Sequence, residues 1–136
     1  MSQNACPVCS YANVEQQDDW RTGSAFFECP RCGPFFINKV ELLTRKSLLS
    51  NPKLSAYIRT YNEQKQEAPR FRRNEVESLL KDLPEYTTKE KMLLFLEVLK
   101  KRAKYPGDLV EIQCKIDYPL VHASQWKEMI HLSREL

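Results

Sequence analysis

This chain of 136 residues is poor in several residue types on which common functional sites depend. With three glycines in the whole chain, a glycine-rich loop that cradles a phosphate group is not expected. The two histidines, His122 and His131, have no cysteine, serine or carboxylate partner at the spacing of a catalytic motif. We therefore predict that the chain is not an enzyme and has no small-molecule substrate.

Long apolar runs are also missing. No segment approaches the roughly 20 apolar residues that cross a bilayer, so we expect no membrane partner. The first residues lack the basic and apolar regions of a secretory signal, which predicts a protein of the reducing cytoplasm. The apolar content of 42% is nonetheless enough for an ordinary core, so a disordered tail is not expected.

Cysteine is the residue whose pattern is most informative. Four of the five cysteines form two pairs, with two residues inside each pair and 19 residues between the pairs: Cys6, Cys9, Cys29 and Cys32. Each pair can aim the two sulfurs of a tight turn at one ion, and two such turns complete a tetrahedral thiolate cage. The spacing predicts a zinc ribbon over residues 1–38. Its Zn²⁺ would be structural, because the protein fills all four coordination positions.

Other interpretations of these cysteines fit less well or remain open. Disulfides are disfavoured in a reducing compartment. A thioredoxin-type redox pair is disfavoured because neither cysteine pair precedes a βαβ pattern. Iron in a rubredoxin-like cage has the same ligands as zinc, and the sequence does not separate the two metals. The fifth cysteine, Cys114, lies on the apolar side of a predicted strand and is interpreted as a small buried side chain.

The remaining pattern predicts a small α+β fold, an N-terminal four-cysteine zinc ribbon followed by a mainly helical domain over residues 39–136. Strands are predicted in the ribbon over residues 11–14, 24–28 and 34–38, with Gly33 in the left-handed conformation after the second cysteine pair. From Lys39 the apolar spacing is helical, and helices are predicted over residues 40–50, 51–68, 74–83, 87–104 and 124–136. Alternation over residues 110–116 predicts one strand with a buried face. We expect the ribbon and the helical domain to have separate cores.

Four of the helix starts are predicted from capping residues, and Ser124 is the one before the last helix. Asn51 precedes a proline, and Asn74 precedes a short apolar helix. Thr87 followed by Glu90 fits a capping box. Residues 70–73, which separate two of the helices, are interpreted as a basic connector or a short strand.

Charge is distributed unevenly along the chain. The formal net charge of +3 conceals a middle region, residues 39–106, with a net charge of +7, while residues 1–38 and 107–136 each carry −2. Such a region can attract phosphate backbones or acidic protein surfaces. Cations are also favoured on exposed helix faces and in last turns without any ligand. The candidates for binding an anionic partner are Arg70, Arg72, Arg73, Lys100, Lys101, Arg102 and Lys104.

The order of these motifs resembles a module of bacterial proteins. The two cysteine pairs, the Pro-Gly-Asp sequence at residues 106–108 and the Asp-Tyr-Pro-Leu sequence at residues 117–120 carry the resemblance, which spans essentially the whole chain. The resemblance implies that the chain is the front part of a larger protein. Some proteins of this group carry TIR or other effector domains linked to phage defence. The resemblance also implies that the second half of the chain is winged-helix-like. The chain ends at Leu136 inside a helical pattern, which fits the same expectation of a longer protein.

Three functions follow as hypotheses. The favoured one is a non-catalytic, zinc-binding recognition or adaptor module that contacts nucleic acid or another anionic partner through the basic middle region. The second is a protein-interaction or oligomerisation module of a bacterial defence-type effector system. The third is a rubredoxin-like iron redox protein, which is the least favoured.

Overall fold

The computed structural model describes residues 2–105 and 107–135, so Pro106 and Leu136, which the sequence analysis used, lie outside the described residues. The N-terminal part forms a five-stranded sheet. Its strands are β1 (Ser2–Asn4), β2 (Val14–Asp19), β3 (Ser24–Cys29), β4 (Gly33–Asn38) and β5 (Arg70–Phe71). They lie side by side in chain order and are antiparallel, except that β5 runs parallel to β4. The chain therefore returns to the sheet edge after an intervening run of helices.

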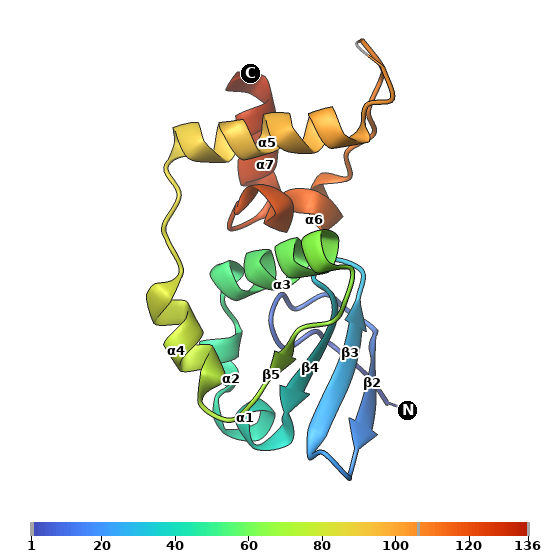
Figure 1. Ribbon diagram of the computed structural model, residues 1–136, viewed down its shortest axis with the longest axis vertical. Helices are drawn as coiled ribbons and strands as arrows, with labels where there is room; N and C mark the ends of the chain where they lie inside the picture. The colour runs from blue at the N-terminus through green and yellow to red at the C-terminus, as the bar shows by residue number, and fades with distance from the viewer. Residues whose placement is uncertain (1, 106, 136) are drawn as a thin grey trace.

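Two groups of helices follow the strands (Figure 1). The first group packs on the sheet and consists of α1 (Lys39–Thr44), α2 (Lys46–Leu49), α3 (Pro52–Lys65) and α4 (Glu75–Asp82). The second group consists of α5 (Thr88–Arg102), α6 (Cys114–Asp117), the 3-10 helix η1 (Tyr118–Val121) and α7 (Trp126–Glu135). We call residues 2–82 the first lobe and residues 88–135 the second lobe. In the described parts of the chain, no helix is both long and apolar enough to cross a membrane.

The starts of α3 and α5 confirm two capping predictions. The Asn51 side chain accepts a hydrogen bond from the Lys53 N–H (2.9 Å), and Pro52 takes the first helical position. The capping box is complete, since the side chains of Thr87 and Glu90 each accept from the other residue's backbone N–H. Both caps join residues at most three positions apart, so their chemistry is visible in the sequence.

Two other helix predictions need correction. The helix predicted over residues 40–50 is divided into α1 and α2, because Arg45 leaves helical geometry (φ −120°, ψ 35°). Asn74 does precede α4, but at φ 69° its side chain makes no capping hydrogen bond. The buried carboxylate of Glu41 accepts the Asn74 N–H instead (3.1 Å). A residue of α1 therefore holds the start of α4.

The strand predicted over residues 110–116 is wrong. Residues 109–113 have no regular secondary structure, and α6 begins at Cys114. The alternating exposure that suggested a strand is nevertheless present, because Ile112 and Cys114 pack against the apolar core of the second lobe while Glu111 and Gln113 are exposed. An irregular segment lying on a core shows the same alternation as a strand edge. The described residues 107–135 contain no strand, so the winged-helix prediction has no support there.

The buried apolar side chains form two cores, one in each lobe. The first joins the inner face of the sheet to α2, α3 and α4 and comprises Val14, Ala25, Phe27, Phe35, Ile37, Leu49, Leu54, Ile58, Phe71 and Val76 with Val8 and three cysteines. The second comprises Phe95, Tyr118, Val121, Ala123, Met129 and Leu132. The expectation that residues 1–38 and 39–136 have separate cores is wrong, because the first core continues from the sheet into the helices. That independently folding domains meet at residue 39 stays a prediction.

Candidate metal centre

The four paired cysteines meet at the end of the sheet next to α3. Cys6 and Cys9 lie in the loop between β1 and β2, Cys29 ends β3, and Cys32 directly precedes β4. All four Sγ atoms lie within 4.8 Å of one another, with Cys9 to Cys29 at 3.4 Å and Cys6 to Cys32 at 3.9 Å. A tetrahedral site with Zn–S bonds of about 2.3 Å places its sulfurs about 3.8 Å apart. The four cysteines therefore have the arrangement needed to coordinate one metal ion.

Hydrogen bonding among the thiols controls their ionisation. Cys6, Cys29 and Cys32 are buried, and Cys9 is half-buried. The hydrogen bond with Cys32 lowers the pKa of the Cys29 thiol, and the same interaction raises the pKa of Cys32. The four thiols therefore titrate as one coupled group. A metal ion that replaces the thiol protons allows all four sulfurs to ionise and to act as ligands.

Backbone turns shape the first cysteine pair. The Ser10 N–H donates to the Cys6 carbonyl oxygen (2.9 Å), and the Cys6 N–H donates to the Tyr11 carbonyl oxygen (2.8 Å). Ser10 and Asn13 both adopt positive φ, 65° and 60°. Because these turns occupy residues 10–13, β2 begins at Val14 rather than at the predicted residue 11.

Gly33 confirms the prediction of a left-handed turn after the second pair. Its φ is 91°, a conformation that residues with a side chain rarely adopt. A Cβ at this position would lie 2.3 Å from Nδ2 of Asn62, which is closer than any real contact. Glycine is therefore required twice, for the turn itself and for the close approach of α3.

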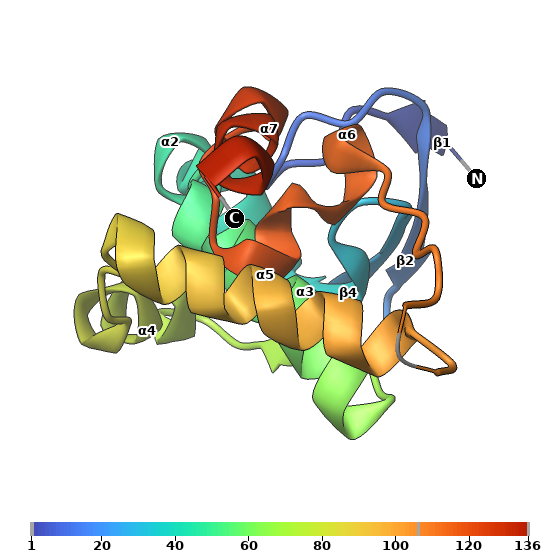
Figure 2. The same cartoon turned by 90° about the horizontal axis from the view of Figure 1, so that it is seen from above.

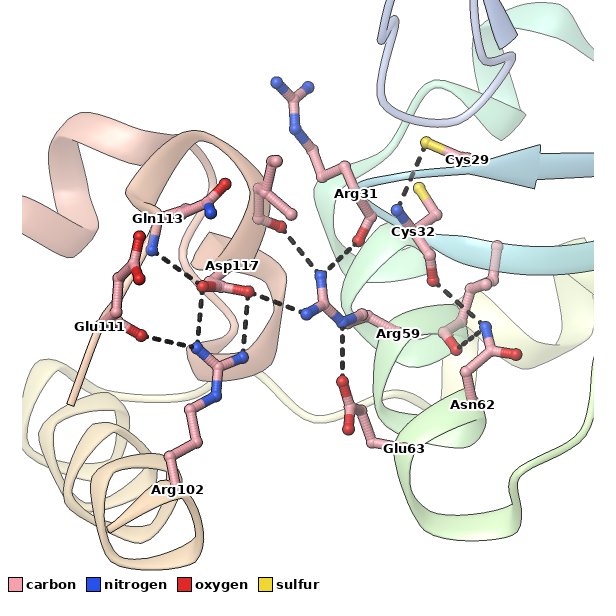
Figure 3. A network of polar contacts seen from close by, with 12 residues as sticks. Cys29, Arg31, Cys32, Arg59, Asn62, Glu63, Arg102, Glu111, Gln113 and Asp117 are labelled. Carbon is pink, nitrogen blue, oxygen red and sulfur yellow. Dashed lines mark hydrogen bonds and ion pairs between the residues drawn. The ribbon is translucent and has the colours of Figure 1, made fainter. Parts of the chain in front are cut away.

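One polar face of α3 supports the second pair, and the sequence analysis did not identify it. The Ser55 Oγ lies 3.2 Å from the Cys32 Sγ, so its hydroxyl can donate to a metal-bound thiolate. An Arg59 N–H donates to the Arg31 carbonyl oxygen (2.9 Å), and the Asn62 amide donates to the Cys32 carbonyl oxygen (3.2 Å). Figure 3 shows two of these side chains, those of Arg59 and Asn62, reaching the turn from α3. The signal in the sequence was a serine, an arginine and an asparagine at helical spacing on an otherwise apolar face.

In the first lobe, the residues predicted to bind an anionic partner lie on β5 and just after it. The exposed guanidinium of Arg70 lies 3.9 Å from the ring centre of Phe36. The Arg72 Nε is 3.9 Å from the Glu75 carboxylate, and an exposed pair at that distance contributes little to stability. Arg73 is exposed and forms no ion pair with the described residues. All three guanidinium groups remain accessible to a ligand.

In the second lobe, the predicted residues lie at the end of α5 and divide into two kinds. Lys100, Lys101 and Lys104 are exposed and form no ion pair with the described part of the chain. Arg102 instead donates to both carboxylate oxygens of Asp117, at 3.0 and 3.1 Å. This hydrogen bonding raises the pKa of Arg102. Arg102 therefore serves an internal contact, and the three lysines are the accessible cations of this group.

No protein-family model, curated protein or solved structure matches this chain. The resemblance to bacterial defence modules therefore stays an expectation that rests on short motifs. The geometry itself supports a closed metal centre of four cysteines in the core of the first lobe, together with accessible cations in both lobes.

Proposed function

We propose that this chain is a non-catalytic recognition module in which a structural zinc ion stabilises the first lobe. Exposed cations of the chain would bind an anionic partner, with nucleic acid as the first candidate. The observation that carries the proposal is the set of predicted cations that remain exposed and without an ion pair among the described residues: Arg70, Arg73, Lys100, Lys101 and Lys104.

The exposed cations come from elements of both lobes. Arg73 directly precedes α4, and Lys100 and Lys101 lie on α5, whose start lies above α4 (Figures 1 and 2). Exposed Lys65 at the end of α3 and Lys89 at the start of α5 add two further cations to the described elements. Several dispersed cations suit an extended phosphate backbone better than a single small anion, because a backbone offers many phosphate groups along its length.

A salt-dependent titration tests binding of nucleic acid by these cations. Fluorescent single-stranded and double-stranded DNA and RNA oligonucleotides are titrated with the full chain over a range of salt concentrations. We expect binding at low salt that weakens steeply as salt rises, because each neutralised phosphate contributes about −0.9 to the slope of log K against log salt for duplex DNA. No binding at low salt would exclude the nucleic-acid proposal.

Matched variants locate the contact. The double variant K100Q/K101Q removes two exposed cations from α5. The control R21Q/K46Q removes two exposed cations of the first lobe that are not among the predicted binding residues. We expect the first variant to weaken binding and to reduce the salt slope by about 2, and the control to leave both unchanged. Equal effects of the two variants would indicate attraction by net charge alone.

Zinc is the proposed metal because all four ligands are thiolates in a closed site. Elemental analysis of the purified chain distinguishes the metals, and we expect one zinc per chain and a colourless protein. A coloured protein with one iron per chain would replace this proposal with the rubredoxin-like alternative. A chain without metal would exclude both.

A protein-interaction or oligomerisation module is the second candidate, favoured by exposed apolar side chains in the second lobe. Leu93 and Leu96 on α5 are 55% and 48% exposed, and Leu109 is 96% exposed. Large exposed apolar groups often mark contacts with another protein. Light scattering after size exclusion tests self-association. A defined oligomer that L93E and L96E dissociate, together with indifference to nucleic acid, would favour this candidate over the first.

A further inference from the structure

The second cysteine pair contacts the second lobe directly. Arg31 lies between Cys29 and Cys32, and its Nε–H donates to the carbonyl oxygen of Lys115 (2.6 Å). Its Nη1 donates to the Cys9 carbonyl oxygen (3.0 Å). The Arg31 guanidinium thus joins the backbone of the first cysteine pair to that of α6. The loop that carries two metal ligands is therefore also a contact surface between the lobes.

Two aromatic rings enclose the same guanidinium. The Arg31 Cζ lies 5.2 Å from the ring centre of Tyr11 in the first lobe and 5.0 Å from that of Tyr118 in the second. Cation–π contacts of this kind stabilise a guanidinium that has lost part of its hydration. Arg31 is thereby held by one ring from each lobe, and moving the lobes apart removes one of the two rings.

A second arginine links the same elements from α3. The Arg59 Nη1 donates to the carbonyl oxygens of both Arg31 (2.9 Å) and Ile116 (3.0 Å), and its Nη2 donates to Asp117 (2.8 Å). Asp117 also accepts from Arg102 and from the Gln113 N–H. Figure 3 shows this chain of contacts running from the cysteine turn through Arg59 to the second lobe. Breaking such a pair from one side leaves the other charge buried and unpaired.

We propose that metal binding by the four cysteines holds the second lobe against the first. We call this coupling the latch. The metal fixes Cys29 and Cys32, and with them the position of Arg31 and of its carbonyl oxygen between the two ligands. When the metal is lost, these groups no longer have one fixed arrangement and the docking contacts on residues 115–118 are weakened. The second lobe has its own core, so it is released as a folded unit.

Release of the lobe would expose a cleft that both lobes line. The cleft is lined by Lys53 and Tyr57 of α3, by Tyr86 in residues 83–87, which connect the lobes, and by His122 of the second lobe. The Tyr86 and His122 rings lie 4.2 Å apart, centre to centre. Metal content would thereby control access to this interlobe surface. The inference rests on the metal binding proposed above and is independent of the proposed nucleic-acid contact.

Hydrogen–deuterium exchange on the full chain tests the latch. The zinc-loaded chain is compared with the chain after treatment with a chelator, and the metal content of both samples is measured. We expect amide exchange in residues 113–121 to become at least about tenfold faster after metal removal, while α5 and α7 keep most of their protection. Unchanged exchange in residues 113–121 would overturn the latch, and so would complete loss of protection in α5 and α7.

Variants that retain all four thiols distinguish the contact between the lobes from the metal site itself. With zinc bound, R31A should show the fast exchange of residues 113–121 that the metal-free chain shows, and removing its metal should add little further. The control R21A removes an exposed arginine of the β2–β3 turn and should behave like the unaltered chain. If R31A and metal removal each increased the exchange of residues 113–121 and their effects were additive, the proposed coupling would be overturned.

A variant on the opposite side of the contact keeps the test decisive if R31A does not fold. Asp117 lies in the second lobe. The D117N variant retains all four cysteines and removes the negative charge to which both Arg59 and Arg102 donate. We expect D117N to bind one zinc and to show the fast exchange of residues 113–121. Normal protection in zinc-bound D117N would contradict the latch. A chain that binds no metal at all would instead refute the proposed metal site, which the measured metal content reveals directly.

Discussion

The two lobes are stabilised by different means. The first lobe places three buried cysteines inside its apolar core, so the metal ligands and the side chains that pack the sheet belong to one cluster. The second lobe consists of helices around six buried residues, and no cysteine cluster lies in its described part. A metal ion bound by the four cysteines would stabilise the first lobe, whereas the helical lobe depends on ordinary burial. The comparison predicts that each lobe can be destabilised without unfolding the other.

Removing a metal ligand should have the largest effect. C29S takes one thiolate from the cage, and structural zinc contributes on the order of 10 kcal/mol to the folding of small zinc domains. Because the first core is shared, we expect the loss to extend beyond residue 38 to α3 and α4, while the helices of the second lobe persist. Zinc content and residue-resolved NMR measure both effects. C114S, which alters the lone thiol of α6, is the control and should retain the metal.

The extent of unfolding in C29S decides between two divisions of the chain. Loss of structure restricted to residues 1–38 would support residue 39 as a boundary between folding units. Loss that includes α3 and α4 would support the division at the connector, residues 83–87. Unfolding of the whole chain in a single transition would contradict both divisions.

The reciprocal experiment truncates a buried aromatic side chain of the second core. Phe95 is buried on α5, and F95A should cost about 3 to 5 kcal/mol, which is enough to unfold a small helical lobe. We expect zinc binding and the first-lobe signals in NMR spectra to survive. L96A, an exposed neighbour on the same helix, should change stability by no more than about 0.5 kcal/mol. Loss of zinc from F95A would show that the metal site depends on the second lobe.

Two glycines with positive φ provide a smaller, matched test in the first lobe. G33A places a Cβ 2.3 Å from Asn62 at φ 91°, so it combines backbone strain with a clash against α3. At Gly23, with φ 67°, no atom lies within 4 Å of the added Cβ, so G23A measures strain alone. We expect G23A to cost about 1 kcal/mol and G33A to cost clearly more. Chemical denaturation followed by tryptophan fluorescence compares them, and equal losses would refute the role of Asn62.

The smallest predicted effect is a pH dependence of the second lobe. Burial and then the positive charge of Lys91 lower the pKa of His122. The unfolded chain therefore takes up a proton first, and stability decreases as pH falls below about 6.5 until the folded form is also protonated. H122Q should flatten this slope in thermal unfolding between pH 7 and 5, whereas H131Q, at an exposed position of α7, should retain it. An unchanged slope in H122Q would exclude this assignment.

The sequence predicts those elements whose causes are local. Two residues separate the cysteines within each pair, and the caps at Asn51 and Thr87 involve residues at most three positions away. Residues 109–113 illustrate the limit of such patterns. Their alternation is the same for a strand and for an irregular segment on a core, and only the presence or absence of a neighbouring strand decides between the two.

By itself, the sequence determined the four candidate metal ligands, the strands β3 and β4 and the starts of α3 and α5, because each depends on neighbours along the chain. The tertiary structure alone decided that the ribbon shares its core with α3 and α4, and that Arg31 meets a carbonyl 84 residues away. Such contacts depend on how separate elements pack, and no periodicity or spacing within one element specifies its partner. The cysteines of the candidate site could be predicted, whereas the contacts of their loop with the second lobe could not.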